Sequence, residues 1–121
     1  MKCKPIYEFL IWDNCKNKCK FCFQRDNPRL FNKAQKEIIL NKTLEFINYN
    51  EFEIGSHILI CGGEIFDTPS DKDILQSFFS NIIELMLKDT IDLLYINTNL
   101  IYSDTSCLFW FLDKINENNL F

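Results

Sequence analysis

The sequence predicts an α/β fold in which three strand–helix units follow one another around a parallel sheet. Three short apolar runs alternate with three longer stretches whose apolar residues recur at helical spacing. Parallel neighbours need a crossover long enough to hold a helix, and such crossovers are right-handed. No linker or low-complexity tract interrupts this rhythm. We therefore expect one domain spanning residues 1–121.

The three predicted strands are Ile6–Trp12, His57–Cys61 and Ile91–Ile96. All are short and apolar, as expected for strands of a parallel sheet. The stretch Asp104–Asn118 is predicted to form the last helix. Strands and helices of these lengths, in this order, favour βα units over a helical bundle or an all-β fold.

Two helix starts carry capping signals. Asn32, with Gln35 three residues later, predicts a capped helix that runs to about Asn50. Thr68 is the predicted cap of the second helix, with Pro69 in its first helical position, where the missing N–H costs nothing.

Three βα units make an open, curved sheet and do not close a barrel. The sequence stops at Phe121, where a fourth strand is expected. We therefore expect a truncated or split protein. A sheet edge left bare in this way is a predicted site of pairing with a second chain.

Charge is distributed unevenly along the chain, whose net charge is −4. Residues 1–42 hold ten Lys or Arg and four acids, whereas residues 43–121 hold three and thirteen. The acidic total argues against a general nucleic-acid binder. The basic residues crowd one segment: Lys16, Lys18, Lys20, Arg25 and Arg29. They either solvate an exposed loop, offset the charge of thiolates and sulfides, or receive an acidic electron donor or an anionic substrate.

Compartment signals favour the cytoplasm. No apolar run approaches the roughly 20 residues of a membrane span, and the N-terminus lacks a secretory signal. Six cysteines could indicate a secreted disulfide framework. Three of them fall on one short segment, however, and the predicted helices are too long for a loop-rich mini-fold.

The most informative motif is Cys15-Lys-Asn-Lys-Cys19-Lys-Phe-Cys22. Thiolates are soft ligands that select zinc, copper(I) or iron–sulfur clusters. A closed site needs four ligands, and neither a ferredoxin run nor a second Cys-x-x-Cys pair follows. Three local thiolates therefore predict a metal centre with one open coordination position.

Two further segments fall after predicted strands, on the face where parallel α/β folds bind ligands. Gly62-Gly63-Glu64 follows the second strand, and Asn97-Thr98-Asn99 follows the third. The chain has only three glycines, so an adjacent pair is informative. The pair fits either a tight turn or a ligand that touches the backbone, and beside the cysteine motif we favour the ligand.

The motif Cys15-x-x-x-Cys19-x-Phe21-Cys22, with Gly62-Gly63-Glu64 after it, resembles the start of a radical S-adenosylmethionine (radical SAM) enzyme. The resemblance covers essentially the whole chain. It implies a (βα)3 half-barrel, the first three units of a partial (βα)6 TIM-like barrel.

The resemblance also implies cofactors and roles. The three cysteines would bind a [4Fe–4S] cluster whose fourth iron is chelated by SAM, and reduction would yield a 5′-deoxyadenosyl radical that abstracts hydrogen from an unknown substrate. SAM contacts would come from Phe21, Gly62, Gly63, Glu64, Thr98 and Asn99. The electron donor would be a flavodoxin or ferredoxin.

The sequence departs from the family pattern at three places. Ile65 stands where a proline often follows the glutamate, and Leu100 stands where the third strand often ends in glycine. The fourth to sixth strands, which supply further SAM contacts and much of the substrate pocket, are missing. These departures put the catalytic competence of the isolated chain in doubt.

The main alternative uses Cys61 as a fourth ligand. If the first two strands are neighbours about 4.8 Å apart, a thiol at the end of the second could reach the cysteine motif. That would make a closed four-cysteine zinc or iron–sulfur site, in a non-catalytic scaffold or partner protein. Against it, Cys61 and Cys107 both fall in apolar runs typical of core cysteines.

Overall fold

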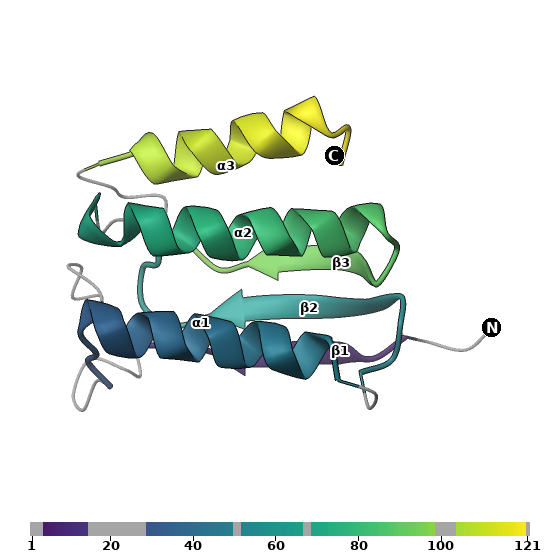
Figure 1. Ribbon diagram of the computed structural model, residues 1–121, viewed down its shortest axis with the longest axis horizontal. Coiled ribbons are helices and arrows are strands. Elements are labelled where there is room, and N and C mark those ends of the chain that lie inside the picture. The colour runs from purple at the N-terminus through teal and green to yellow at the C-terminus, as the bar shows by residue number, and fades with distance from the viewer. Residues whose placement is uncertain (1–3, 15–28, 50–51, 67–68, 99–103, 121) are drawn as a thin grey trace.

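The structure is a computed structural model that describes residues 4–14, 29–49, 52–66, 69–98 and 104–120. Strands and helices alternate along the chain as the sequence predicts (Figure 1). They are β1 (Ile6–Leu10), α1 (Lys33–Ile47), β2 (Ser56–Cys61), the short 3-10 helix η1 (Pro69–Asp71), α2 (Lys72–Leu87), β3 (Ile91–Ile96) and α3 (Ser106–Glu117).

The three strands form one parallel sheet in the order β1-β2-β3. In register, Leu10 lies opposite Cys61 and Ile60 lies opposite Ile96. The carboxyl ends of all three strands therefore meet at one edge of the sheet, which we call the carboxyl edge (Figure 1). The predicted α/β class and parallel sheet are confirmed.

Among the described residues, one face of the sheet carries the core, and the other is largely uncovered. Tyr7 and Phe9 on β1 contact Phe46 of α1 through their rings. Their neighbours Ile6 and Leu10 point to the other face and are 58% and 50% exposed. Because side chains alternate along a strand, this contrast places the helices on one face alone. We call the second face the open face.

The core lies between the sheet and the helices, which run side by side in the order α1, α2, α3 (Figure 1). Phe79 of α2 is fully buried and contacts the rings of Phe66, Phe78 and Phe111. Burial of a phenylalanine side chain contributes roughly 1.5–3 kcal/mol. This cluster therefore joins α2 to α3 and to the chain that follows β2.

The helix starts match the prediction in one case and differ in another. Asn32 and Gln35 form the predicted capping box at α1. The predicted cap Thr68 lies outside the described residues. Pro69 begins the 3-10 turn η1, and the α-helix itself starts three residues later, with Asp71 in the cap position. The side chain of Asp71 turns inward to an ion pair with Lys36 and does not cap the helix.

Two elements, β1 and α1, also end earlier than predicted. β1 ends at Leu10 rather than Trp12, although the Ile11 amide still donates to the Cys61 carbonyl. α1 ends at Ile47, short of the predicted Asn50. In the described part of the chain, no helix has the length and apolar character needed to cross a membrane.

Candidate functional site

Two backbone segments lie against each other at the carboxyl edge. The Gly63 amide donates to the Trp12 carbonyl at 2.7 Å, and the Glu64 amide donates to the Asn14 carbonyl at 3.1 Å. The turn that follows β2 is thereby bonded to the stretch that follows β1. We call residues 12–14 the entry segment, because Cys15 comes directly after it in the sequence.

The glycine pair is required by how closely these segments approach. A Cβ atom on Gly62 would lie 2.2 Å from the Trp12 carbonyl oxygen, and one on Gly63 would lie 2.1 Å from that of Asn14. Gly62 also has a φ of +152°, which side chains rarely adopt. The chain's own backbone therefore accounts for both glycines. That a ligand also touches this backbone stays a prediction.

Glu64 and Thr98, two of the predicted SAM contacts, come together. Glu64 is buried, with only 3% of the residue exposed. Its Oε1 accepts a hydrogen bond of 2.6 Å from the Thr98 hydroxyl. A buried carboxyl group needs hydrogen-bond partners in place of the water it loses. The structure thus holds the Glu64 carboxylate at the carboxyl edge, bonded to the chain that follows β3.

Asp13 in the entry segment is paired with Arg29. The Arg29 Nε and Nη2 atoms donate to the two carboxylate oxygens at 3.0 and 3.1 Å, and its backbone amide donates to Oδ2 at 2.7 Å. The guanidinium hydrogen bond holds the pKa of the Asp13 carboxyl below its usual value, against the opposing effect of burial. Arg29, predicted as part of a basic cluster, is thus tied to a single acid.

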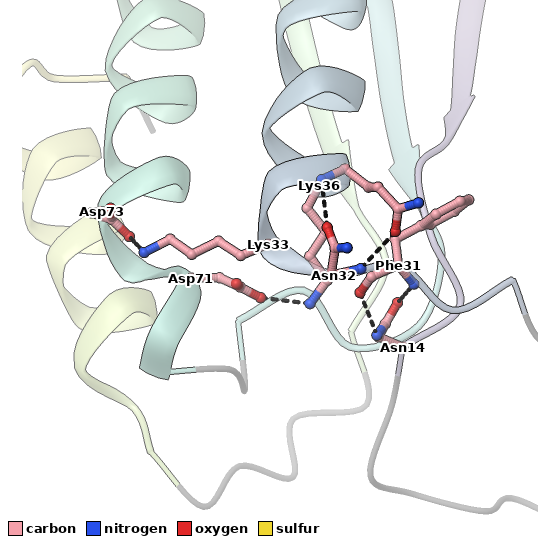
Figure 2. A network of polar contacts seen from close by, with 8 residues as sticks. Asn14, Phe31, Asn32, Lys33, Lys36, Asp71 and Asp73 are labelled. Atoms are coloured by element: carbon pink, nitrogen blue, oxygen red, sulfur yellow. Dashed lines mark hydrogen bonds and ion pairs between the residues drawn. The ribbon is translucent and has the colours of Figure 1, made fainter.

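Asn14 makes a second tie to the same stretch of chain. Its Oδ1 accepts from the Phe31 amide at 3.1 Å, and its Nδ2 donates to the Phe31 carbonyl at 3.2 Å (Figure 2). Phe31 directly precedes Asn32, which caps α1. The entry segment is therefore fixed to the start of α1.

A buried ion pair, formed by Lys36 and Asp71, lies next to Trp12 of the entry segment. Lys36 of α1 donates to Asp71 at 2.6 Å, and both side chains are about 5% exposed or less (Figure 2). The Lys36 ammonium also lies 5.1 Å from the ring centroid of Trp12. A nearby pair, Lys33 with Asp73, is exposed. Together these contacts join β1, α1 and α2 on the side of the sheet where the strands end.

Cys61 lies at the end of β2 among polar groups from both neighbouring strands. Its Sγ donates to Glu8 Oε1 at 3.5 Å and accepts from Asn97 Nδ2 at 3.3 Å. Burial, followed by the Glu8 carboxylate, raises the pKa of the thiol. The neutral thiol is therefore favoured as the structure stands. β1 and β2 are neighbours, as the four-cysteine alternative requires.

The remaining predicted site residues lie outside the part of the chain that the structure describes. They are Cys15, Cys19, Phe21, Cys22 and Asn99. Among the described residues, no three metal-ligating side chains come together. Both the open cluster site and its closed alternative therefore stay predictions.

The sequence interpretation missed the partners of the entry segment. Asp13 and Asn14 stand directly before the first cysteine, which was a signal that they matter. Nothing in the spacing indicated that Arg29, rather than another basic residue, would pair with Asp13.

Comparison with known proteins gives no match at any level, whether to family models, to curated proteins or to solved structures.

Proposed function

We propose that this protein is a radical SAM enzyme, or a fragment of one, and that it binds a [4Fe–4S] cluster and SAM at the carboxyl edge of its sheet. The observation that carries the proposal is the position of Glu64. Its buried carboxylate is held by Thr98, and its amide is bonded to Asn14, the residue before Cys15. The carboxylate and the first predicted cluster ligand thus belong to stretches of chain that adjoin each other.

The donors at this edge suit the proposed cofactors. Cys15, Cys19 and Cys22 would supply the soft thiolates that iron–sulfur clusters require. Glu64 would accept a hydrogen bond from the amino group of SAM, aided by backbone carbonyls of the glycine pair. When bound, the two cofactors would supply one-electron cleavage of the sulfonium and a carbon radical for hydrogen abstraction.

The protein's own residues have a positioning role in this proposal. Thr98 orients the Glu64 carboxylate, Asn14 fixes the Glu64 amide, and Trp12 fixes that of Gly63. Phe21 and Asn99 would add the adenine and polar contacts that the family resemblance implies. Rigid placement of this kind is what a cofactor site requires, because small displacements of reacting groups are costly.

The proposal also includes the rest of the barrel, the electron donor and the cell compartment. The three βα units would form half of a six-unit barrel, with the open face toward its interior. A second chain, or further chain of the same protein, would supply the other strands. A flavodoxin or ferredoxin, both acidic donors, would suit the excess of positive charge in residues 1–42. A reducing cytoplasm suits both the cluster and these donors.

A non-catalytic module with a closed four-cysteine site is the alternative. It is favoured by one observation, the position of Cys61 at the carboxyl edge beside Leu10, one strand away from the entry segment. Against it, the Cys61 thiol already has partners in the fold, since it donates to Glu8 and accepts from Asn97.

Electron paramagnetic resonance tests the proposal. The protein would be reconstituted anaerobically with iron and sulfide, reduced, and measured with and without SAM. A [4Fe–4S]⁺ signal that changes on adding SAM supports the open site. Zinc in place of a cluster would sink it.

A Cys61→Ala variant separates the two hypotheses. An open site predicts that this variant keeps the iron content and the SAM response of the unaltered protein, whereas Cys19→Ser loses both. A closed site predicts that the two variants lose the metal alike.

A further inference from the structure

The contacts of Asp13 and Arg29 form a closed pattern. The Arg29 guanidinium meets the carboxylate through two hydrogen bonds, one to each oxygen, and the Arg29 amide adds a third. In return, the Asp13 amide donates to the Arg29 carbonyl at 3.0 Å. Backbone and side chain thus join the same two residues. Only an arginine can make the two-pronged contact, because a lysine ammonium is a single point charge.

The two residues flank the cysteine motif. Asp13 comes two positions before Cys15, and Arg29 comes seven positions after Cys22. The hydrogen bonds between Asn14 and Phe31 make a second tie of the same kind. Asn14 directly follows Asp13, and Phe31 lies two positions after Arg29. The chain on either side of residues 15–28 is therefore held together by two independent sets of hydrogen bonds.

The burial of the pair is one-sided. The Asp13 side chain is 5% exposed, whereas that of Arg29 is 48% exposed. The carboxylate sits inside the fold, and the arginine covers it from solvent. Loss of the arginine would leave a buried carboxylate with fewer donors, whereas loss of the acid would leave an arginine that water can solvate.

The pair is also joined to the Glu64 turn. Asn14 follows Asp13, and its carbonyl accepts from the Glu64 amide, while Trp12 on the other side accepts from Gly63. Any shift of Asp13 must therefore disturb the two bonds that fix the turn. Within the entry segment, Trp12 belongs to the hydrophobic core, whereas Asp13 and Asn14 do not. The positions of Asp13 and Asn14 therefore depend on their polar contacts.

We propose that Asp13 and Arg29 are a positioning pair, which locks the chain before and after the cysteine motif to the Gly62–Glu64 turn. The geometry of this lock stands on the described contacts alone. What it positions, a cluster relative to the SAM-binding carboxylate, rests on the proposed function. Neither residue is expected to touch a cofactor.

Hydrogen exchange of single amides, followed by NMR in the protein without cofactors, tests the lock directly. The variants are Asp13→Asn and Arg29→Met, with Arg29→Lys as the conservative change. Glu53→Gln is the matched control, because Glu53 pairs with Lys4 at 3.7 Å at the other end of β1. Each variant is first checked for cooperative unfolding.

The amides of Gly63 and Glu64 report on the lock, and the Asn97 amide, bonded to the Ile60 carbonyl, reports on the sheet. In Arg29→Met we expect exchange at Gly63 and Glu64 to rise roughly three- to tenfold, as loss of one hydrogen bond of ordinary net strength implies, because the Arg29 side chain is half exposed. The Asn97 amide should keep its rate. A uniform rise at all three amides, or no rise at any, would overturn the proposal.

The response of the cluster signal to SAM then tests whether the pair positions the cofactors. In the reconstituted protein, the SAM concentration that gives a half-maximal change in the resonance signal should rise at least threefold in Arg29→Met and less in Arg29→Lys. Glu53→Gln should match the unaltered protein.

The failure modes differ. If the unaltered protein binds no cluster or SAM while the exchange result holds, the proposed function fails and the lock stands. If the SAM response is the same in every variant, the pair has no positioning role.

Discussion

Thr98 donates a hydrogen bond of 2.6 Å to Glu64 and so links the chain that follows β3 to the chain that follows β2. The two residues differ in environment, because Thr98 is exposed and Glu64 is buried. A hydroxyl donor is well suited to a buried carboxylate, which would otherwise lose its hydration without replacement. The bond thus helps to hold the Glu64 side chain in place at the carboxyl edge.

Replacing Thr98 by Val should weaken this edge. Valine keeps the shape of the side chain and removes the hydroxyl, so we expect the free energy of unfolding to fall by about 1–2 kcal/mol. Thr98→Ser retains the donor and should lose less than half as much. Urea unfolding of the two variants measures the difference. Equal losses would show that the methyl group, and not the hydrogen bond, matters at this position.

The sequence predicted the fold well because its signals are local. Alternating runs of strand and helix periodicity are properties of neighbouring residues, and the parallel sheet follows from their order. The capping box at Asn32 and Gln35 is local in the same sense, since both partners lie within one turn. The bounds of β3, predicted as Ile91–Ile96, agree with the structure.

The contacts that organise the carboxyl edge could not be predicted in this way. Asp13 had several basic residues within reach along the chain, and only the folded backbone selects Arg29. The start of α2 shows the same limit. The sequence favoured Thr68 and Pro69, but Asp71 pairs with Lys36, which lies 35 positions earlier. Long-range partners of this kind depend on how the units pack.

The contact between the Gly62–Glu64 turn and the entry segment predicts a large cost for Gly63→Ala. The added Cβ would meet the Asn14 backbone at 2.1 Å, and a backbone atom cannot move aside as a flexible side chain can. We expect a loss of about 3 kcal/mol.

Gly55→Ala is the matched control. Its Cβ would have only the Lys4 side chain nearby, at 3.6 Å, although its φ of +84° adds backbone strain. A loss of about 1 kcal/mol is expected there. Thermal unfolding by circular dichroism gives both values. A Gly63→Ala variant as stable as Gly55→Ala would mean that the two segments separate easily.

The buried pair of Lys36 and Asp71 predicts a non-additive response. Lys36→Met alone leaves a buried, unpaired carboxylate, so we expect a loss of about 3–5 kcal/mol. Adding Asp71→Leu removes that charge and should restore much of the loss, since two apolar side chains can replace a buried ion pair at little cost. Denaturant unfolding of both single variants and the double variant provides the cycle. Additive losses would contradict the pairing.

Cys107 provides a pH-dependent prediction that is independent of the proposed site. Cys107 lies in α3 and is only 2% exposed. Burial raises the pKa of its thiol from 9.0 to about 11, and Lys72 has a smaller, opposing effect. A raised pKa means that the folded state favours the neutral thiol. The resulting stability is therefore present below pH 9, the unfolded pKa, and is lost as the pH rises toward 11.

The difference in unfolding free energy between the unaltered protein and Cys107→Ala isolates this effect, because other groups titrate alike in both. Below pH 9 the difference should be constant and set by the lost packing. Between pH 9 and 11 it should fall by roughly 2–3 kcal/mol, the equivalent of the pKa shift. Urea unfolding at several pH values measures it. A difference that stays constant up to pH 11 would show that the Cys107 thiol ionises as easily in the folded chain as in the unfolded one.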